Sequence, residues 1–166
     1  MLDPVEVVAW IRAVNPTVTQ RAESGTRRAL FAIYHMCHSE GRIDFVVWLF
    51  TALESLLSTK VGENFSGMVR RASLVLGLDK SETKHLSTRL RKLYDLRSSF
   101  VHGGYAVAHP LHYEAIDRRL DKDYAEVLEL SKYGFSVLAA ILQAMVMNKR
   151  LSLAFEERIV ESGNAA

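Results

Sequence analysis

The residues Arg97 and His102 carry the side chains of this sequence best suited to chemistry on a phosphate. Histidine changes charge near neutral pH and serves as a general acid or base, while arginine grips phosphate oxygens with two parallel hydrogen bonds. Such a pair is suited to acid–base chemistry on a phosphate group, where the arginine would stabilise the charge that develops.

Arg97 falls on the apolar stripe of a predicted helix, where a charge is unusual. The preceding positions of that stripe, at steps of four and three, are leucines (Leu86, Leu90 and Leu93). A buried guanidinium needs a carboxylate or an anion to offset its desolvation. Glu54 is the only charged residue strictly between positions 44 and 60, in another apolar helix. We therefore predict that Glu54 and Arg97 face each other and that the pair orients the guanidinium.

The spacing of Arg97 and His102 is awkward for a single helix. At about 100° per residue, the two side chains are roughly 140° apart and cannot share one face. Two arrangements would still bring them together. The backbone can turn at the glycines Gly103 and Gly104 that follow, or a second copy of the helix can supply the missing partner across a two-fold axis. A plainer interpretation makes Glu54–Arg97 a structural ion pair and His102 a helix cap.

Other groups of reactive side chains predict less. His35 and His38 share one helical face, but Cys37 does not, and no fourth ligand is near, so we expect no metal. His109 and His112 flank Pro110 in a predicted loop. The sequence contains no phosphate-binding glycine loop, dinucleotide fingerprint or nucleophile elbow, and we expect no cofactor.

The segment from Leu93 to Gly104, LYDLRSSFVHGG, resembles the signature of the HEPN superfamily, in which a histidine follows an arginine after four to six residues. It is most similar to the Apea-like or Abi-like branch, where such a string closes a long helix. The segment from Trp48 to Leu57, WLFTALESLL, is similar to the apolar helix of that branch. The two segments cover about 22 residues directly, and the predicted helical order fits over roughly residues 25–148.

The resemblance implies a fold, an activity and partners. The fold is all-α, a compact antiparallel helical bundle with extra terminal helices, forming one domain over residues 1–166. The implied activity is that of a metal-independent endoribonuclease, with Arg97 and His102 as the catalytic pair in a cleft built by two protomers. The ribose 2′-hydroxyl would attack the phosphate, so the expected products are a 2′,3′-cyclic phosphate and a 5′-hydroxyl, and DNA should not be cut. The partners are RNA, a second copy of the chain, and an antitoxin or regulatory protein if the role is that of a toxin or a phage-defence effector.

Further residues enter as support for this site. Glu54, Asp95, Ser98 and Tyr105 are the supporting residues, and the basic residues Arg89, Arg91 and Lys92 are expected to bind RNA. Many active members of the superfamily carry Asn, Asp or His after the arginine, where this chain has Ser98, a weaker orienting group. The tyrosine of the HEPN–nucleotidyltransferase toxins falls one residue earlier than Tyr105. A non-catalytic module for RNA binding or dimerisation and a purely structural helical interaction domain therefore remain as alternatives.

The elements that must position these residues are helices throughout. Asp3, Pro4 and Glu6 favour a helix start, Asp44 is the expected N-cap of the apolar helix, and Asp79 with Glu82 forms a capping box before the helix that carries Arg97. The predicted helices cover residues 4–13, 25–38, 44–59, 63–76, 80–102 and 122–148, with a preceding helix broken near residue 121, a loop at 103–112 and a short amphipathic tail at 151–160.

Composition sets the broader frame. The chain has 166 residues with 49% hydrophobic and 24% charged residues, ordinary values for one soluble domain. A single cysteine excludes an intramolecular disulfide and fits a reducing cytoplasm. The N-terminus lacks a signal-peptide pattern, and the longest apolar stretch, residues 135–147, is short of the roughly 20 residues that cross a bilayer. We therefore expect a cytoplasmic protein without membrane contact.

The net charge of +2 conceals an uneven distribution. Residues 70–97 contain eight basic and three acidic residues, a local charge of +5, and the rest of the chain carries −3. A solvated helix face is the usual explanation of such a run. Here the run leads directly to the Arg97–His102 motif, where a polyanion would have to dock.

Overall fold

The computed structural model describes residues 2–14, 21–39, 43–59, 65–107 and 118–156, with the backbone alone over 118–123. The described residues form helices and no strands, which confirms the all-α prediction. The helices are α1 (Pro4–Val14), α2 (Gly25–Cys37), α3 (Ile43–Leu56), α4 (Phe65–Leu76), α5 (Lys80–Val101) and α6 (Arg118–Met147).

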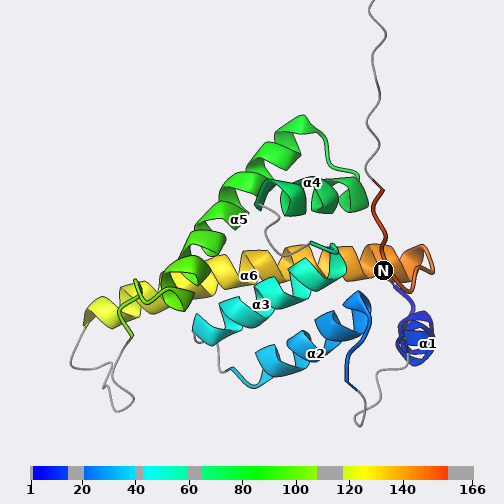
Figure 1. Cartoon of the computed structure of the whole chain (residues 1–166), viewed down its shortest axis with the longest axis horizontal. Helices are drawn as coiled ribbons and strands as arrows, with labels where there is room; N and C mark the ends of the chain where they lie inside the picture. The colour runs from blue at the N-terminus through cyan, green and yellow to red at the C-terminus, as the bar shows by residue number, and fades with distance from the viewer. Residues whose placement is uncertain (1, 15–20, 40–42, 60–64, 108–117, 157–166) are drawn as a thin grey trace, which may run out of the picture.

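The long helix α6 contacts α1, α3, α4 and α5, whereas α2 packs against α3 (Figure 1). The apolar helix α3 lies along α6, with α2 on the outer side of α3. The helices α4 and α5 cover the opposite side and diverge from each other toward the turn that joins them. In this compact helical arrangement, the C-terminal end of α5 lies beside the first half of α6.

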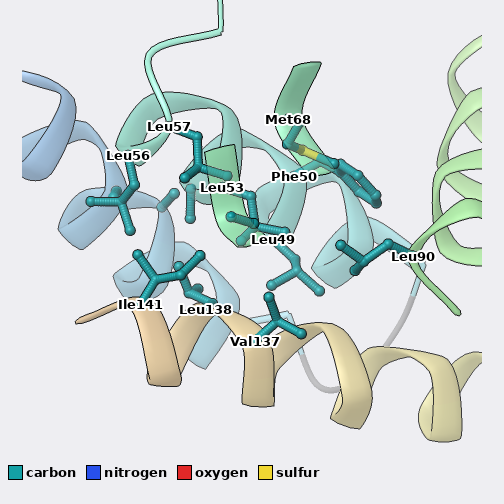
Figure 2. Packing of buried hydrophobic residues seen from close by; sticks show 14 of the residues in the cluster. Leu49, Phe50, Leu53, Leu56, Leu57, Met68, Leu90, Val137, Leu138 and Ile141 are labelled. Carbon is teal, nitrogen blue, oxygen red and sulfur yellow. The ribbon is translucent and has the colours of Figure 1, made fainter. Parts of the chain in front are cut away.

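The core is centred on α3. Figure 2 shows the α3 side chains Leu49, Phe50 and Leu53 packed between Leu138 of α6 and Leu90 of α5. All five side chains are almost entirely buried. The near-continuous apolar run of α3 is therefore explained by burial on several sides, because α2, α5 and α6 all contact this helix.

The core extends beyond the range of 25–148 expected from the sequence. Trp10 of α1 is buried and its indole Nε1 donates a hydrogen bond of 2.8 Å to the carbonyl of Arg150. The hydroxyl of Thr26 donates to the carbonyl of Leu151 at 2.7 Å. These bonds tie the first helix and the segment after α6 to the same core.

Three sequence predictions about helix ends are corrected. The helix α3 begins at Ile43, so Asp44 lies in its first turn and is not the N-cap. The helix α6 runs unbroken through residue 121, and residues 151–156 are not helical. The expected segments at 108–112 and 157–160 lie outside the described residues, as do the ends predicted near residues 16 and 63.

A close approach of three helices positions the candidate site. Gly134 of α6 is so near Leu49 of α3 and Leu93 of α5 that a Cβ atom there would collide with both leucine side chains. Because glycine lets the three backbones approach, α3 and α5 are brought together over α6. Glu54 lies one turn beyond this junction on α3, and Arg97 lies one turn beyond it on α5.

Candidate functional site

The helix α5 carries the candidate catalytic residues, and its ends are those predicted from the sequence. Asp79 caps its N-terminus, because its carboxylate accepts a hydrogen bond from the backbone N–H of Glu82 at 2.8 Å. The carboxylate of Glu82 in turn accepts from the backbone N–H of Asp79 at 2.9 Å. At the other end Gly103 takes a positive φ of 77°, and the backbone N–H of Gly104 donates to the carbonyl of Ser99 at 2.8 Å. The glycine cap thus stops the helix directly after His102.

The predicted pairing of Arg97 with Glu54 is confirmed. Nη2 of Arg97 lies 4.0 Å from Oε2 of Glu54, and the two side chains are 26% and 37% exposed. This distance is that of an ion pair and exceeds that of a hydrogen bond. The buried Nε of Arg97 has no hydrogen-bond partner among the described residues. The guanidinium is therefore held near a carboxylate, and the exposed part of the side chain can still contact an anion.

Burial of the Glu54 carboxylate raises its pKa above the ordinary value of 4.5, and the charge of Arg97 opposes this shift. Desolvation is the larger of the two effects. Burial and the charge of Arg97 thus act in opposite directions on the pKa of this carboxylate.

This raised pKa predicts a pH-dependent contribution to stability. The folded state retains the Glu54 proton over a pH range in which the unfolded chain has lost it. The contribution is therefore fully present below the unfolded pKa and is lost as the pH rises through the folded pKa. We expect the free energy of unfolding of wild type, minus that of Glu54→Gln, to decline in urea titrations as the pH rises above the ordinary glutamate pKa of 4.5.

Glu129 provides a control of opposite sign. Its pKa is lowered, chiefly by a hydrogen bond from Lys132 of 2.8 Å. The corresponding difference for Glu129→Gln should therefore grow as the pH rises and be lost as the pH falls through the folded pKa. The same pH trend in both variants would contradict the assignment for Glu54.

His102 is exposed at the end of α5 and points away from the Arg97 side of the helix. Its backbone is close to helical, with φ −97° and ψ 11°, and its N–H donates to the carbonyl of Ser98 at 3.0 Å. The turn occurs only at Gly103, one residue too late to rotate His102 toward Arg97. Within one chain the two side chains therefore keep the roughly 140° separation of a regular helix.

The structure gathers two of the expected supporting residues in one hollow. Asp95 and Tyr105 line a recess of about 430 Å³ between α5 and the start of α6, together with Lys92. The ring of Tyr105 meets that of Phe100 edge to face at 6.0 Å. Ser98 is half-buried on α5 and lies one residue after Arg97. The expected supporting residues thus surround the C-terminal third of α5 without forming one continuous surface.

The basic residues expected to bind RNA point in different directions. The guanidinium of Arg89 lies 4.9 Å from the ring centroid of Tyr133 on α6, while that of Arg91 lies 3.9 Å from the ring of Phe65 on α4. Arg89 and Arg91 therefore stack on opposite neighbours of α5 and do not make one patch. Their two-residue spacing, about 200° on a helix, carried this signal in the sequence.

Another basic residue of the charged run has a structural role. Arg71 is 5% exposed, and its Nη1 donates to the carbonyls of Leu57 and Ser58 at 3.0 and 2.9 Å. Its guanidinium also lies 5.3 Å from the ring of Phe155. Arg71 thus fixes the end of α3 and the segment after α6, and its charge is not available to an approaching polyanion.

The structure also shows a basic groove that the sequence prediction did not single out. Arg70 of α4 and Lys80 and Lys84 of α5 line one hollow between these helices. The signal in the sequence was the spacing of four between the two lysines, which places them on one face of a helix. The charge run of residues 70–97 contained all three, but its total did not say which of its members share a surface.

The histidines of α2 are engaged with aromatic rings. His35 stacks on Trp48 of α3 with ring centroids 4.1 Å apart, and His38 meets Tyr34 edge to face at 4.7 Å. Cys37 is exposed. Among the residues that the structure describes, no group of three or more His, Cys, Asp or Glu side chains is placed to hold a metal ion.

One helix in the described part of the chain, Tyr124–Met147 within α6, is long and apolar enough to cross a membrane by length and composition alone. Of its most apolar stretch of 18 residues, 39% is buried in the structure. Leu138, Ile141 and Met145 belong to its core-facing side. A core helix with this composition passes the same test, so the observation is weak evidence for a membrane span.

Comparison with known proteins gives no match to this chain. No family model fits it, and no curated protein or solved structure is similar to it. The fold and the site geometry are therefore the observations on which a function must rest, and the resemblance of residues 93–104 and 48–57 to the HEPN superfamily stays a prediction.

Proposed function

We propose that this protein is a metal-independent endoribonuclease of the HEPN type, in which Arg97 and His102 act on RNA in a cleft shared by two protomers. The observation that carries the proposal is the state of Arg97. Its guanidinium is half-buried, lies 4.0 Å from a single carboxylate, and has a buried Nε without a partner among the described residues. An arginine held in this way is preoriented for an anion such as a phosphate.

The roles follow from the chemistry of the two side chains. His102 accepts the proton of the ribose 2′-hydroxyl or delivers one to the departing 5′-oxygen. Arg97 stabilises the extra negative charge on the phosphate as the new P–O bond forms and the old one breaks. Glu54 acts on Arg97 and not on the substrate: it holds the guanidinium in position across the α3–α5 contact. The 2′-oxygen is the nucleophile, which is why DNA is not a substrate.

A second protomer completes the site in this proposal. In one chain Arg97 lies on the core side of α5 while His102 points to solvent. If two copies pair through the C-terminal ends of α5, the His102 of one can approach the Arg97 of the other. Near this end α5, α6 and the segment between them expose Val101, Val107 and Leu128 at 50%, 71% and 46%, so apolar surface is available for pairing.

A non-catalytic RNA-binding module is the second candidate. It is favoured by the separation of Arg97 and His102 within one chain, because a monomer would have a phosphate-binding arginine without an acid or base beside it. The half-buried Ser98 hydroxyl would then be a further phosphate ligand. A role as a toxin or in phage defence, and location in the cytoplasm, belong to the first candidate and rest on the resemblance alone.

The test uses labelled single-stranded RNA in the presence of EDTA. The proposal expects cleavage that leaves 2′,3′-cyclic phosphate and 5′-hydroxyl ends, no cleavage of the matching DNA, and a dimer by light scattering at micromolar concentration. RNA binding without any cleavage would favour the second candidate. A monomer that still cleaves RNA would contradict the shared cleft.

A further inference from the structure

The groove between α4 and α5 combines positive charge with hydroxyl groups. It has a volume of about 760 Å³ and is lined by Arg70, Lys80 and Lys84 together with the α5 hydroxyls of Thr83, Ser87 and Thr88. None of its described lining residues is acidic. The two lysines are exposed, so their charges are accessible to a ligand. This composition is that of a surface for an anionic ligand.

Part of the lining of the groove is apolar. Val69 and Leu74 of α4 and Leu78 at the turn between the helices line it, and Leu74 is 70% exposed. A ligand that is anionic along one edge and apolar or aromatic along the other would satisfy both parts. A single-stranded nucleic acid has this character, because its phosphates alternate with sugars and bases that can cover apolar surface.

The carboxylates nearest the start of α5 are directed away from the groove. Glu82 lines a different hollow, on the α6 side of α5, with His85 and Tyr133. Asp79 and Glu82 also bond each other's backbone N–H groups in the capping box. The acidic residues of this helix start are therefore used in its cap, and the face toward α4 remains basic.

The groove and His102 lie on the same face of α5. Lys84 and His102 are 18 residues apart, which is five full turns at 3.6 residues per turn. Thr88 lies four residues after Lys84, and Arg91 lies three residues after Thr88, so both fall on the line between Lys84 and His102. At 1.5 Å per residue the separation along the helix is about 27 Å, close to the length of eight stacked nucleotides at about 3.4 Å each.

We propose that the α4–α5 groove binds the sugar–phosphate backbone of RNA at a position about eight nucleotides from the bond that is cut. This inference rests on the proposed ribonuclease function and adds a second contact to it. Lys80, Lys84 and Arg70 contact phosphates, Thr83 and Ser87 add hydrogen bonds, and Arg91, stacked on Phe65, lies on the path to His102. The groove makes the enzyme select substrates by length.

The test compares a 16-nucleotide RNA with a 4-nucleotide RNA. Binding is measured by fluorescence anisotropy in His102→Ala protein, so that the RNA stays intact. Adding Lys80→Ala and Lys84→Ala should weaken binding of the 16-mer roughly tenfold at 0.1 M salt and reduce the slope of log affinity against log salt by about 1.4. Binding of the 4-mer should not change. The control, Arg12→Ala with Lys132→Ala, removes two exposed charges elsewhere and should leave both affinities unchanged.

The outcomes separate this inference from the function on which it rests. Wild-type protein that cleaves RNA, with equal 16-mer affinity in the lysine variant and the control variant, overturns the groove and leaves the ribonuclease function standing. A 16-mer affinity that depends on the two lysines in a protein that never cleaves RNA supports the groove and overturns the ribonuclease function. Absence of any RNA binding overturns the groove.

Discussion

Replacement of His102 by alanine is expected to lower the rate of RNA cleavage by about 10²- to 10⁴-fold, the range lost with a general acid or base. The affinity for RNA should stay the same, because His102 is exposed at the end of α5 and contributes no core contact. Single-turnover cleavage of labelled RNA in EDTA measures the rate, and anisotropy measures the affinity.

His85→Ala is the matched control for this variant. His85 is also an exposed histidine of α5, four turns and more before His102, and its ring meets Tyr133 edge to face at 6.1 Å. Its removal should leave the cleavage rate within a factor of about two of wild type, since surface changes away from a site have small effects. Equal losses in the two variants would show that His102 is not the acid or base.

Replacement of Arg97 by alanine is expected to reduce cleavage by about 10²- to 10³-fold, the cost of removing one preorganised electrostatic donor. Arg97→Lys should recover only part of this loss, because an ammonium group keeps the charge but cannot form the planar, two-pronged contact with phosphate. The measurement is again the single-turnover rate, with a melting curve for each variant.

The structural role of Arg97 must be separated from the catalytic one. In Arg97→Ala the carboxylate of Glu54 loses the charge that opposes its burial, so its pKa should rise further and the protein should lose stability near neutral pH. Arg97→Ala with Glu54→Gln removes this unpaired carboxylate. If the double variant regains stability but not cleavage, Arg97 acts on the substrate. If cleavage returns with stability, the ion pair is structural only.

Mixing the two inactive variants tests whether the site is shared. In a mixed dimer of Arg97→Ala and His102→Ala chains, one Arg97–His102 pair across the interface is intact and the other lacks both residues. With random exchange, half of the dimers are mixed, so recovery of up to roughly a quarter of wild-type activity is expected. Dimers that exchange without recovery would mean that the pair acts within one chain or that a cut needs all four side chains.

The caps of α5 and the Glu54–Arg97 contact were predictable from the sequence for different reasons. The capping box of Asp79 and Glu82 and the cap at Gly103 are local, because their hydrogen bonds span only a few residues. The contact of Glu54 with Arg97 spans 43 residues, but each is a charge on an apolar stripe, and two such charges stabilise each other when the stripes meet.

The errors also have physical causes. Asp44 is a good N-cap residue by type, yet α3 starts at Ile43 and packs it against the core. The expected break near residue 121 is wrong, since α6 runs as one helix from Arg118 to Met147. Arg89 and Arg91 were grouped by sequence proximity, whereas the rings of Tyr133 and Phe65 hold them on opposite sides of α5.

The sequence by itself determined the helical class, most helix limits, and the candidate residues for chemistry on a phosphate. These depend on side-chain type and on spacing along one chain, which the 3.6-residue period converts into faces. Only the tertiary structure decided which of those faces meet. It set the distance of 4.0 Å between Arg97 and Glu54 and joined Arg70 to Lys80 and Lys84 in one groove. Such distances depend on how closely helices pack, as at Gly134, and no period in the sequence encodes that.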